Sequence, residues 1–251
     1  MPSDRVDFPG SQGAQLAGRL DRPDGELRAT ALFAHCFTCS KDIHAASRIS
    51  RGLAEQGYAV LRFDFTGLGH SEGEFAHTDF TSNCEDVVVA ADWLAEHEQA
   101  PSLLIGHSLG GAAVLAVAPR IDSVRAVATV GAPSDPAHVA EHFGVLREQI
   151  EREGSAEVQL AGRTFRIRRE FLEDIERHRL DRSLADLKRA LMIFHSPLDA
   201  TVGIENAAHI YKAAKHPKSF VSLDGADHLL TDPADSEFVS NILADWVHRY
   251  L

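Results

Sequence analysis

A serine in a glycine-rich turn is the residue whose surroundings most clearly predict chemistry. Gly106, Ser108 and Gly110 form a Gly-x-Ser-x-Gly pattern between an apolar run at 102–106 and a run of small residues at 112–118. The first run is typical of a buried strand and the second of a helix, so Ser108 falls on a strand-to-helix turn. Small residues two positions before and after it let strand and helix approach closely around a strained serine. We therefore predict that Ser108 is a nucleophile.

A nucleophilic serine needs a general base, and the base needs a carboxylate that orients it. Asp199 follows an apolar run at 190–195, and His228 follows another at 219–223. Both runs predict strands, which places Asp199 and His228 in loops at two strand ends. We predict that they are the acid and the base. Asp135, after an earlier predicted strand, is the alternative acid.

The serine also needs donors for the oxyanion that forms when it attacks a carbonyl. Leu109 follows Ser108 at the start of the predicted helix, where amide N–H groups and the positive helix end favour negative charge. Its backbone N–H is the predicted donor. His107 precedes the serine, and we expect its side chain to flank the pocket.

The elements that must position these residues follow from hydrophobic periodicity. Short apolar runs alternate with longer helical patterns, which predicts an α/β fold with a mostly parallel sheet flanked by helices. The predicted strands are 5–8, 15–20, 29–34, 59–64, 102–106, 124–130, 190–195 and 219–223, and the predicted helices are 43–56, 81–98, 112–118, 203–214 and 236–250. The first two strands are expected to form an antiparallel pair at one sheet edge. The whole chain, residues 1–251, is predicted to be a single domain.

Residues 138–189 do not follow this alternation of short apolar runs and helical patterns. They predict a lid or cap inserted into the domain. The segment holds 11 acidic and 11 basic residues, ten of them arginine, so it is neutral within a chain of net charge −12. Apolar runs at 158–160 and 164–167, on either side of Ala161 and Gly162, predict a small hairpin between two helices. A helical insertion that is exposed to solvent is a simpler interpretation than a lid, and the two are compatible.

Composition excludes several classes of protein. The 251 residues include 25 Lys or Arg and 37 Asp or Glu, a balance that argues against binding to nucleic acid. Apolar stretches are far shorter than the roughly 18 residues of a membrane span, and the polar N-terminus lacks the apolar region of a secretory signal. The 14 histidines show no convincing metal-ligand spacing, so neither a metal nor another cofactor is predicted. The three cysteines, an odd count, favour a reducing compartment, and a cytoplasmic location is expected.

Together these motifs resemble the α/β-hydrolase superfamily, particularly its serine-aminopeptidase-like and feruloyl-esterase-like members, over essentially the full chain. The order Ser108, Asp199, His228 is the superfamily's order of triad residues. His35 resembles the histidine of the family's His-Gly oxyanion loop, and residues 63–71 resemble its Asp-x-x-Gly-x-Gly-x-Ser segment. The resemblance implies an eight-stranded, mostly parallel sheet.

The resemblance also implies that Phe37 supplies the second oxyanion N–H. His35, Cys36 and His107 are then expected around the substrate pocket. Cys36 departs from the pattern because the family usually has glycine there, and a positive φ at that position would strain cysteine. Residues 33–42 are also similar to hydrolase domains that occur joined to OsmC-type peroxide-protection domains, so a functional link to such a protein is a partner hypothesis. A homodimer is another.

These observations predict a serine hydrolase, and first a carboxylesterase that acts on a small or medium acyl ester through an acyl-enzyme. A peptidase or amidase of the same fold is an alternative. Cys36 and Cys39 form a Cys-x-x-Cys pattern before the predicted helix at 43–56, which supports a dithiol redox protein as another alternative. In a secondary role, oxidation of this pair inhibits the serine chemistry. A non-catalytic binding protein on this fold is the third alternative.

Overall fold

An eight-stranded sheet forms the centre of the computed structural model, which describes residues 1–160 and 162–251. The strands are β1 (Ser3–Pro9), β2 (Gln15–Asp21), β3 (Ala29–Ala34), β4 (Tyr58–Phe63), β5 (Leu103–His107), β6 (Ala126–Val130), β9 (Ala190–His195) and β10 (Lys218–Ser222). Their order across the sheet is β1-β2-β4-β3-β5-β6-β9-β10. Only β2 pairs antiparallel, with β1 at the edge and with β4. The predicted fold, a mostly parallel eight-stranded sheet with an antiparallel edge, is confirmed.

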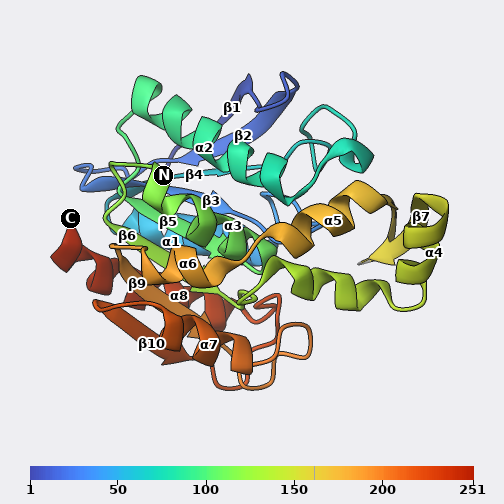
Figure 1. Ribbon diagram of the computed structural model, residues 1–251. Coiled ribbons are helices and arrows are strands. Elements are labelled where there is room, and N and C mark those ends of the chain that lie inside the picture. The colour runs from blue at the N-terminus through green and yellow to red at the C-terminus, as the bar shows by residue number, and fades with distance from the viewer. Residues whose placement is uncertain (161) are drawn as a thin grey trace.

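Helices cover both faces of this sheet (Figure 1). α1 (His44–Glu55) and α8 (Pro233–Val247) pack on one face, and α2 (Phe80–His97), α3 (Leu109–Val117) and α7 (Glu205–Ala213) pack on the other. Helix α8 begins three residues before its predicted start because the Asp232 side chain caps it and Pro233 occupies its first turn. In the described part of the chain, no helix has both the length and the apolar character that a bilayer crossing requires.

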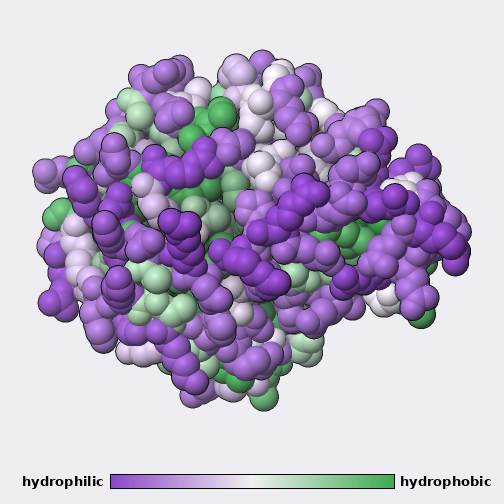
Figure 2. Space-filling view, viewed as in Figure 1, coloured by the Kyte–Doolittle hydropathy of each residue, from purple (hydrophilic) through white to green (hydrophobic). Residues whose placement is uncertain are grey.

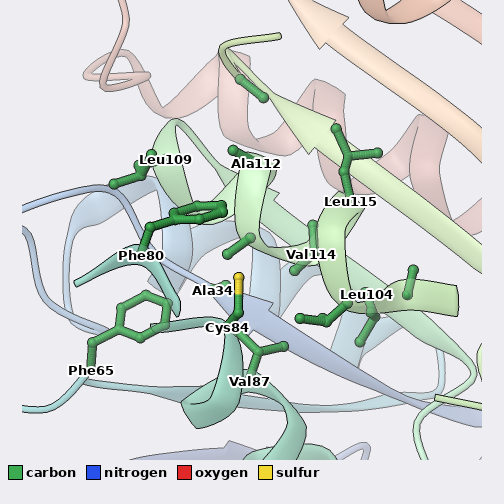
Figure 3. Packing of buried hydrophobic residues seen from close by; sticks show 14 of the residues in the cluster. Ala34, Phe65, Phe80, Cys84, Val87, Leu104, Leu109, Ala112, Val114 and Leu115 are labelled. Carbon is green, nitrogen blue, oxygen red and sulfur yellow. The ribbon is translucent and has the colours of Figure 1, made fainter. Parts of the chain in front are cut away.

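The central strands are buried on both faces of the sheet, which explains why their sequences are continuous apolar runs. In β3, Leu32 and Ala34 belong to the core on the α2 and α3 face, whereas Ala31 and Phe33 belong to the core on the α1 and α8 face. Figure 3 shows the first of these cores, where α2 side chains such as Cys84 lie among residues of the strands and of α3.

The chain between β6 and β9 leaves the sheet. It forms the 3-10 helix η3 (Pro136–Phe143), the helices α4 (Leu146–Glu153), α5 (Arg169–Arg177) and α6 (Leu180–Ala185), and the strands β7 (Ser155–Leu160) and β8 (Arg163–Arg168). β7 and β8 pair antiparallel as the expected hairpin, although Ala161 at its predicted tip lies outside the described residues. The segment has more helical pieces than the two expected. Figure 2 shows hydrophilic side chains over most of this face, with apolar ones visible between α5 and the α4 region.

A buried charge network ties the loop after β3 to the sheet. Arg62 on β4 is only 1% exposed, and its Nε donates to Asp21 Oδ2 at 2.8 Å. Its Nη1 donates to Asp42 Oδ1 and to the Lys41 carbonyl, each at 2.7 Å. The Lys41 ammonium in turn donates to Asp64 Oδ2 at 2.8 Å. The loop that begins at the end of β3 is therefore fixed at Lys41 and Asp42.

Removing Arg62 tests how much this network stabilises the protein. Arg62→Ala is expected to lower the free energy of unfolding by about 3–5 kcal/mol, because Asp21 would stay buried without its partner. Arg19 is a matched control, since it pairs with Asp42 at 3.3 Å while partly exposed, and Arg19→Ala should cost less than about 1 kcal/mol. Urea unfolding measures both, and equal losses would contradict this account.

Candidate active site

Ser108 lies where the main chain passes from β5 directly into α3. Its φ of 55° and ψ of −126° lie outside the regions that L-residues favour, and its N–H donates to the Val130 carbonyl at 2.9 Å. A Cβ on Gly106 would lie 2.4 Å from the Gly110 carbonyl oxygen, and a Cβ on Gly110 would lie 2.4 Å from that of Ala34. Both glycines are therefore needed, because a side chain at either position would collide with main-chain atoms.

Asp199 and His228 meet at the ends of β9 and β10. His228 Nδ1–H donates to Asp199 Oδ2 at 2.7 Å, while Asp199 Oδ1 accepts from the amides of Thr201 and Val202 at 2.9 Å each. Burial raises the pKa of Asp199, but the hydrogen bonds from His228 and from the two amides outweigh this effect and hold the pKa below its usual value. An ionised Asp199 keeps the proton on Nδ1, which leaves His228 Nε2 free to accept one.

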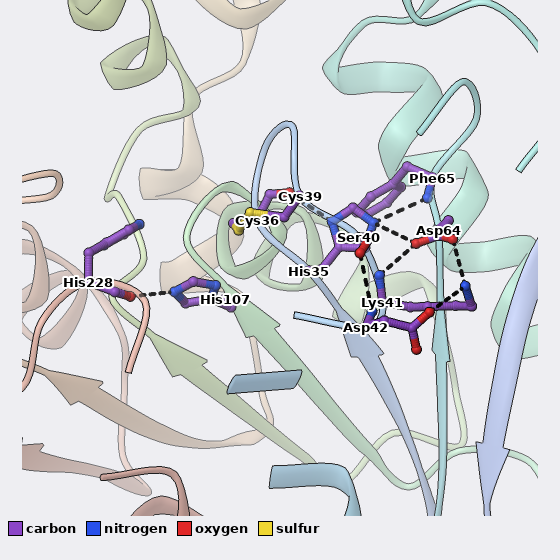
Figure 4. The surroundings of a disulfide bond; sticks show 10 residues. All are labelled: His35, Cys36, Cys39, Ser40, Lys41, Asp42, Asp64, Phe65, His107 and His228. Atoms are coloured by element: carbon purple, nitrogen blue, oxygen red, sulfur yellow. Dashed lines mark hydrogen bonds and ion pairs between the residues drawn. A yellow bond between two sulfur atoms is a disulfide. The ribbon is translucent and has the colours of Figure 1, made fainter. Parts of the chain in front are cut away.

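The His107 side chain was expected to flank the pocket. It is instead fully buried, next to His228. Its Nε2 lies 2.7 Å from the His228 carbonyl oxygen (Figure 4), and the two rings are 5.0 Å apart. Burial, helped by the charge of His228, lowers the pKa of His107 to about 3, so the ring is neutral at neutral pH. Because a carbonyl only accepts, the proton is on Nε2, and Nδ1 has no partner among the described residues. His107 therefore holds the backbone that carries His228.

A cavity of about 460 Å³ opens beside Ser108 and His228. This volume lies within the roughly 300–1,000 Å³ of small-molecule sites. The turn at 36–39 forms part of the wall, and Val139 and Leu160 contribute to it from the segment between β6 and β9. Among the described residues on this wall, none is Asp, Glu, Lys or Arg. The cavity therefore suits an uncharged group.

Two backbone amides are available to a ligand in this cavity. Phe37 and Leu109 both line it, and within the described chain neither N–H donates to an acceptor. The turn that carries Phe37 has its positive φ, 63°, at Thr38. Cys36 is not among the described residues with positive φ, so the strain expected at Cys36 from the missing family glycine falls on Thr38 instead.

The cysteines differ from the expectation of free thiols. Cys36 and Cys39 form a disulfide, and Cys84 is free and buried among apolar side chains. Burial raises the pKa of the Cys84 thiol. Helix α1 starts at His44, one residue after its predicted start.

The structure places the remaining candidates in supporting positions. Asp135, the alternative acid, makes other contacts. Its Oδ1 accepts from the Ala137 amide, and its Oδ2 pairs with Arg179 at 2.9 Å. His35 is absent from the described wall of the large cavity and lines a smaller neighbouring pocket of about 10 Å³. Its Nδ1–H donates to the Cys36 carbonyl at 2.7 Å, so it supports the turn rather than contacting the cavity.

Two supporting contacts were not predicted from the sequence. The amides of Thr201 and Val202 hold Asp199 in an Asx turn, and an aspartate two residues before the first of them is the available signal. The contact from His107 to the His228 carbonyl joins residues 121 positions apart and has no local signal. Among the described residues, no group of three or more His, Cys, Asp or Glu side chains could hold a metal ion.

Comparison with known proteins finds similarity to a family of serine hydrolases and to solved esterases. A family model described as serine aminopeptidase, S33, matches residues 25–150, which is half of the chain. The solved esterase domain of a Rhodothermus marinus protein is 50% identical, with a TM-score of 0.81, over 100% of this chain and 99% of that one. Est1E from Butyrivibrio proteoclasticus with bound ferulic acid has a TM-score of 0.84 at 20% identity, over 98% and 99% of the two chains.

A curated relative is the mouse mitochondrial palmitoyl-protein thioesterase ABHD10. It is 27% identical over 200 residues, which are 77% of this chain and 66% of the relative. The chain thus spans about two thirds of the length of that relative.

The neutral state of buried His107 predicts a pH dependence of stability. Its pKa of about 3 in the folded protein lies below the ordinary 6.5, so below about pH 6.5 the unfolded chain binds a proton that the folded protein does not. Between pH 7 and pH 5 this contributes a loss of about 2 kcal/mol in the free energy of unfolding.

His107→Gln removes that contribution and keeps a side-chain N–H for the His228 carbonyl. We expect urea unfolding of this variant to depend less on pH than that of the wild type, by about 2 kcal/mol over the same interval. Parallel profiles for the two proteins would show that the pKa of His107 is not lowered in the native state.

Proposed function

The chain belongs to the serine aminopeptidase S33 family, within the α/β-hydrolase superfamily, and from this premise we propose that it is a carboxylesterase. It is a hydrolase by membership of this family. The observation that carries the finer proposal is the 2.7 Å hydrogen bond between His228 and Asp199, beside a cavity that Ser108 also lines.

In the proposed reaction His228 Nε2 removes the hydroxyl proton of Ser108 as the serine oxygen attacks the ester carbonyl. Asp199, held by three hydrogen bonds, keeps the imidazole oriented and stabilises the imidazolium without taking its proton. The imidazolium then protonates the leaving alcohol. Water, activated by the same imidazole, releases the acid from the acyl-enzyme.

The amides of Phe37 and Leu109 are the proposed oxyanion donors. Support comes from their position on the cavity wall and from the absence of an acceptor for either N–H within the described chain. Donors of this kind act where charge develops in the transition state, and removing one typically lowers kcat by about 10²–10³-fold.

The cavity favours a neutral acyl ester over a peptide with a free amino terminus. Capture of a substrate ammonium calls for a carboxylate, and none is present on the described wall. Ester or thioester hydrolysis also matches the names of the relatives, an esterase domain and a palmitoyl-protein thioesterase. A small or medium acyl group is the proposed substrate, since the cavity holds about 460 Å³.

Residues 138–189 are proposed to act as a cap over this cavity. Val139 and Leu160 reach its wall from this segment. Phe171 of α5 lies 5.3 Å, ring to ring, from Phe37 in the proposed oxyanion turn. The segment therefore contacts both the cavity and the turn.

The nucleophile is tested by fluorophosphonate labelling of the wild type and of Ser108→Ala. The wild type should label and hydrolyse an ester panel, whereas Ser108→Ala should lose labelling and at least about 10⁴-fold in kcat. Labelling that persists in Ser108→Ala, or a wild type that never labels, would refute the proposal.

The acid is tested by a matched pair of substitutions. Asp199→Asn should lower kcat by about 10⁴-fold because the imidazole would be held in the wrong tautomer. Asp135→Asn keeps an oxygen that can accept from the Ala137 amide and removes only the charge that pairs with exposed Arg179, so its kcat should stay within about twofold of the wild type. The opposite ranking in steady-state ester assays would identify Asp135 as the acid.

A further inference from the structure

We propose that the Cys36–Cys39 disulfide positions the oxyanion amide of Phe37 and thereby makes ester hydrolysis depend on the redox state of this pair. The inference rests on the proposed function, because it concerns the same oxyanion. It reverses the direction expected from the sequence: the oxidised pair is the active form.

The disulfide closes the turn that carries the amide. The Cα atoms of Cys36 and Cys39 are 5.3 Å apart, and the Cys39 N–H donates to the Cys36 carbonyl at 3.2 Å. Phe37 and Thr38 are the two residues between them. A four-residue turn joined at both ends by a covalent bond has few other conformations available to its central amides.

The turn needs this constraint because of the residue at its third position. Thr38 has a φ of 63°, a left-handed conformation that β-branched residues rarely adopt. A glycine there would adopt it without steric cost, but threonine favours rotation of the neighbouring peptide units to negative φ. When the sulfurs are separated, the main-chain hydrogen bond from the Cys39 N–H to the Cys36 carbonyl, at 3.2 Å, is what still closes the turn.

The surrounding contacts fix the two ends of the loop. The main chain at its centre is held by the disulfide. His35 fixes the Cys36 carbonyl from one side, and Asp64 Oδ1 accepts from the Lys41 amide at 2.6 Å on the other (Figure 4). At the centre, the Phe37 ring packs 5.5 Å from that of Phe75. Ring packing places the side chain of Phe37, but it does not set the direction of its N–H.

The sulfurs are accessible through the substrate cavity. Cys36 and Cys39 both line it together with Ser108; Cys36 is buried, and Cys39 is half-buried. A small dithiol can therefore reach Cys39 Sγ by the route that the ester takes. Its thiolate attacks Cys39 Sγ and breaks the S–S bond, and Cys36 leaves as a thiolate.

The second thiol of the reductant then attacks its own sulfur in this mixed disulfide and releases the Cys39 thiolate. The protein disulfide gains two electrons and two protons, and the dithiol loses them as it becomes a cyclic disulfide. Cys84 takes no part, since it is buried in the apolar core and is not among the residues that line the cavity.

The effect on kinetics distinguishes positioning from stability. The oxyanion contact strengthens in the transition state, so a displaced Phe37 amide lowers kcat and leaves KM nearly unchanged. If the disulfide served only stability, its reduction would lower the melting temperature of the protein. It would not change kcat at temperatures below the melting transition.

The experiment compares kcat and KM on a short-chain p-nitrophenyl ester for oxidised protein and for protein reduced with dithiothreitol and desalted without air. Thiol titration in denaturant verifies the states, with one free cysteine when oxidised and all three when reduced. We expect kcat to fall at least about tenfold on reduction, with KM changed less than twofold, and to recover on reoxidation. Unchanged kcat with three thiols counted, or a loss that only accompanies loss of the folded circular dichroism spectrum, overturns the proposal.

Three variants sharpen this test. Cys36→Ser/Cys39→Ser should have the low kcat of the reduced enzyme under all conditions, and Cys84→Ala should keep the full redox response. Adding Thr38→Gly to the double variant should raise its kcat, because glycine takes the positive φ without a tether. A double variant with wild-type kcat, or one that Thr38→Gly does not improve, refutes the positioning role.

Failure of the proposed function has a different outcome. In that case the oxidised wild type itself shows neither ester turnover nor fluorophosphonate labelling, and the redox inference falls with it. An oxidised enzyme that labels at Ser108 and is unaffected by reduction rejects the redox inference alone.

Discussion

The close approach of α3 to β5 and to the end of β3 is the constraint on which the site depends. Gly106 lets the helix main chain meet the strand, and Gly110 lets it meet the carbonyls of Ala34 and His35. The first contact presents Ser108 at the carboxyl edge of the sheet. The second sets the start of the turn that carries Phe37 against the helix that carries Leu109, so these two contacts fix the nucleophile relative to both proposed oxyanion donors.

Buried polar groups then hold the loops that this packing leaves free. Asp199 is held by amides of its own loop, the His228 backbone by His107, and the loop after β3 by Arg62 and Asp64. Each of these contacts pairs a polar group of the interior, where an unpaired one is costly, although His107 Nδ1 has no partner among the described residues. The same pairing that stabilises the fold thus orders the residues around the cavity.

Local sequence patterns were sufficient for most of the scaffold. Every strand of the sheet lies within two residues of its predicted bounds. In the central strands, burial on both faces produces apolar runs that end at glycine, proline or polar residues. The placement of Ser108, Asp199 and His228 at strand ends followed from the same runs.

The sequence was less informative where distant segments meet. The contact from His107 to the His228 carbonyl depends on tertiary packing, and the pairing of Cys36 with Cys39 depends on a turn whose strained residue, Thr38, carries no glycine signal. The insertion at 138–189 and its hairpin were predicted from the sequence, but the sequence did not indicate that Val139 and Leu160 would line the cavity. These features arise from the fold as a whole, which local periodicity does not describe.

The division of the cavity wall has an evolutionary consequence. The residues proposed to carry out the reaction come from loops at the ends of β5, β9 and β10, whereas Val139 and Leu160 come from the chain between β6 and β9. Substitutions at Val139 or Leu160 change the shape of the cavity without replacing the proposed acid, base or nucleophile. Natural variation at these two positions can therefore alter which acyl groups fit while the proposed triad is preserved.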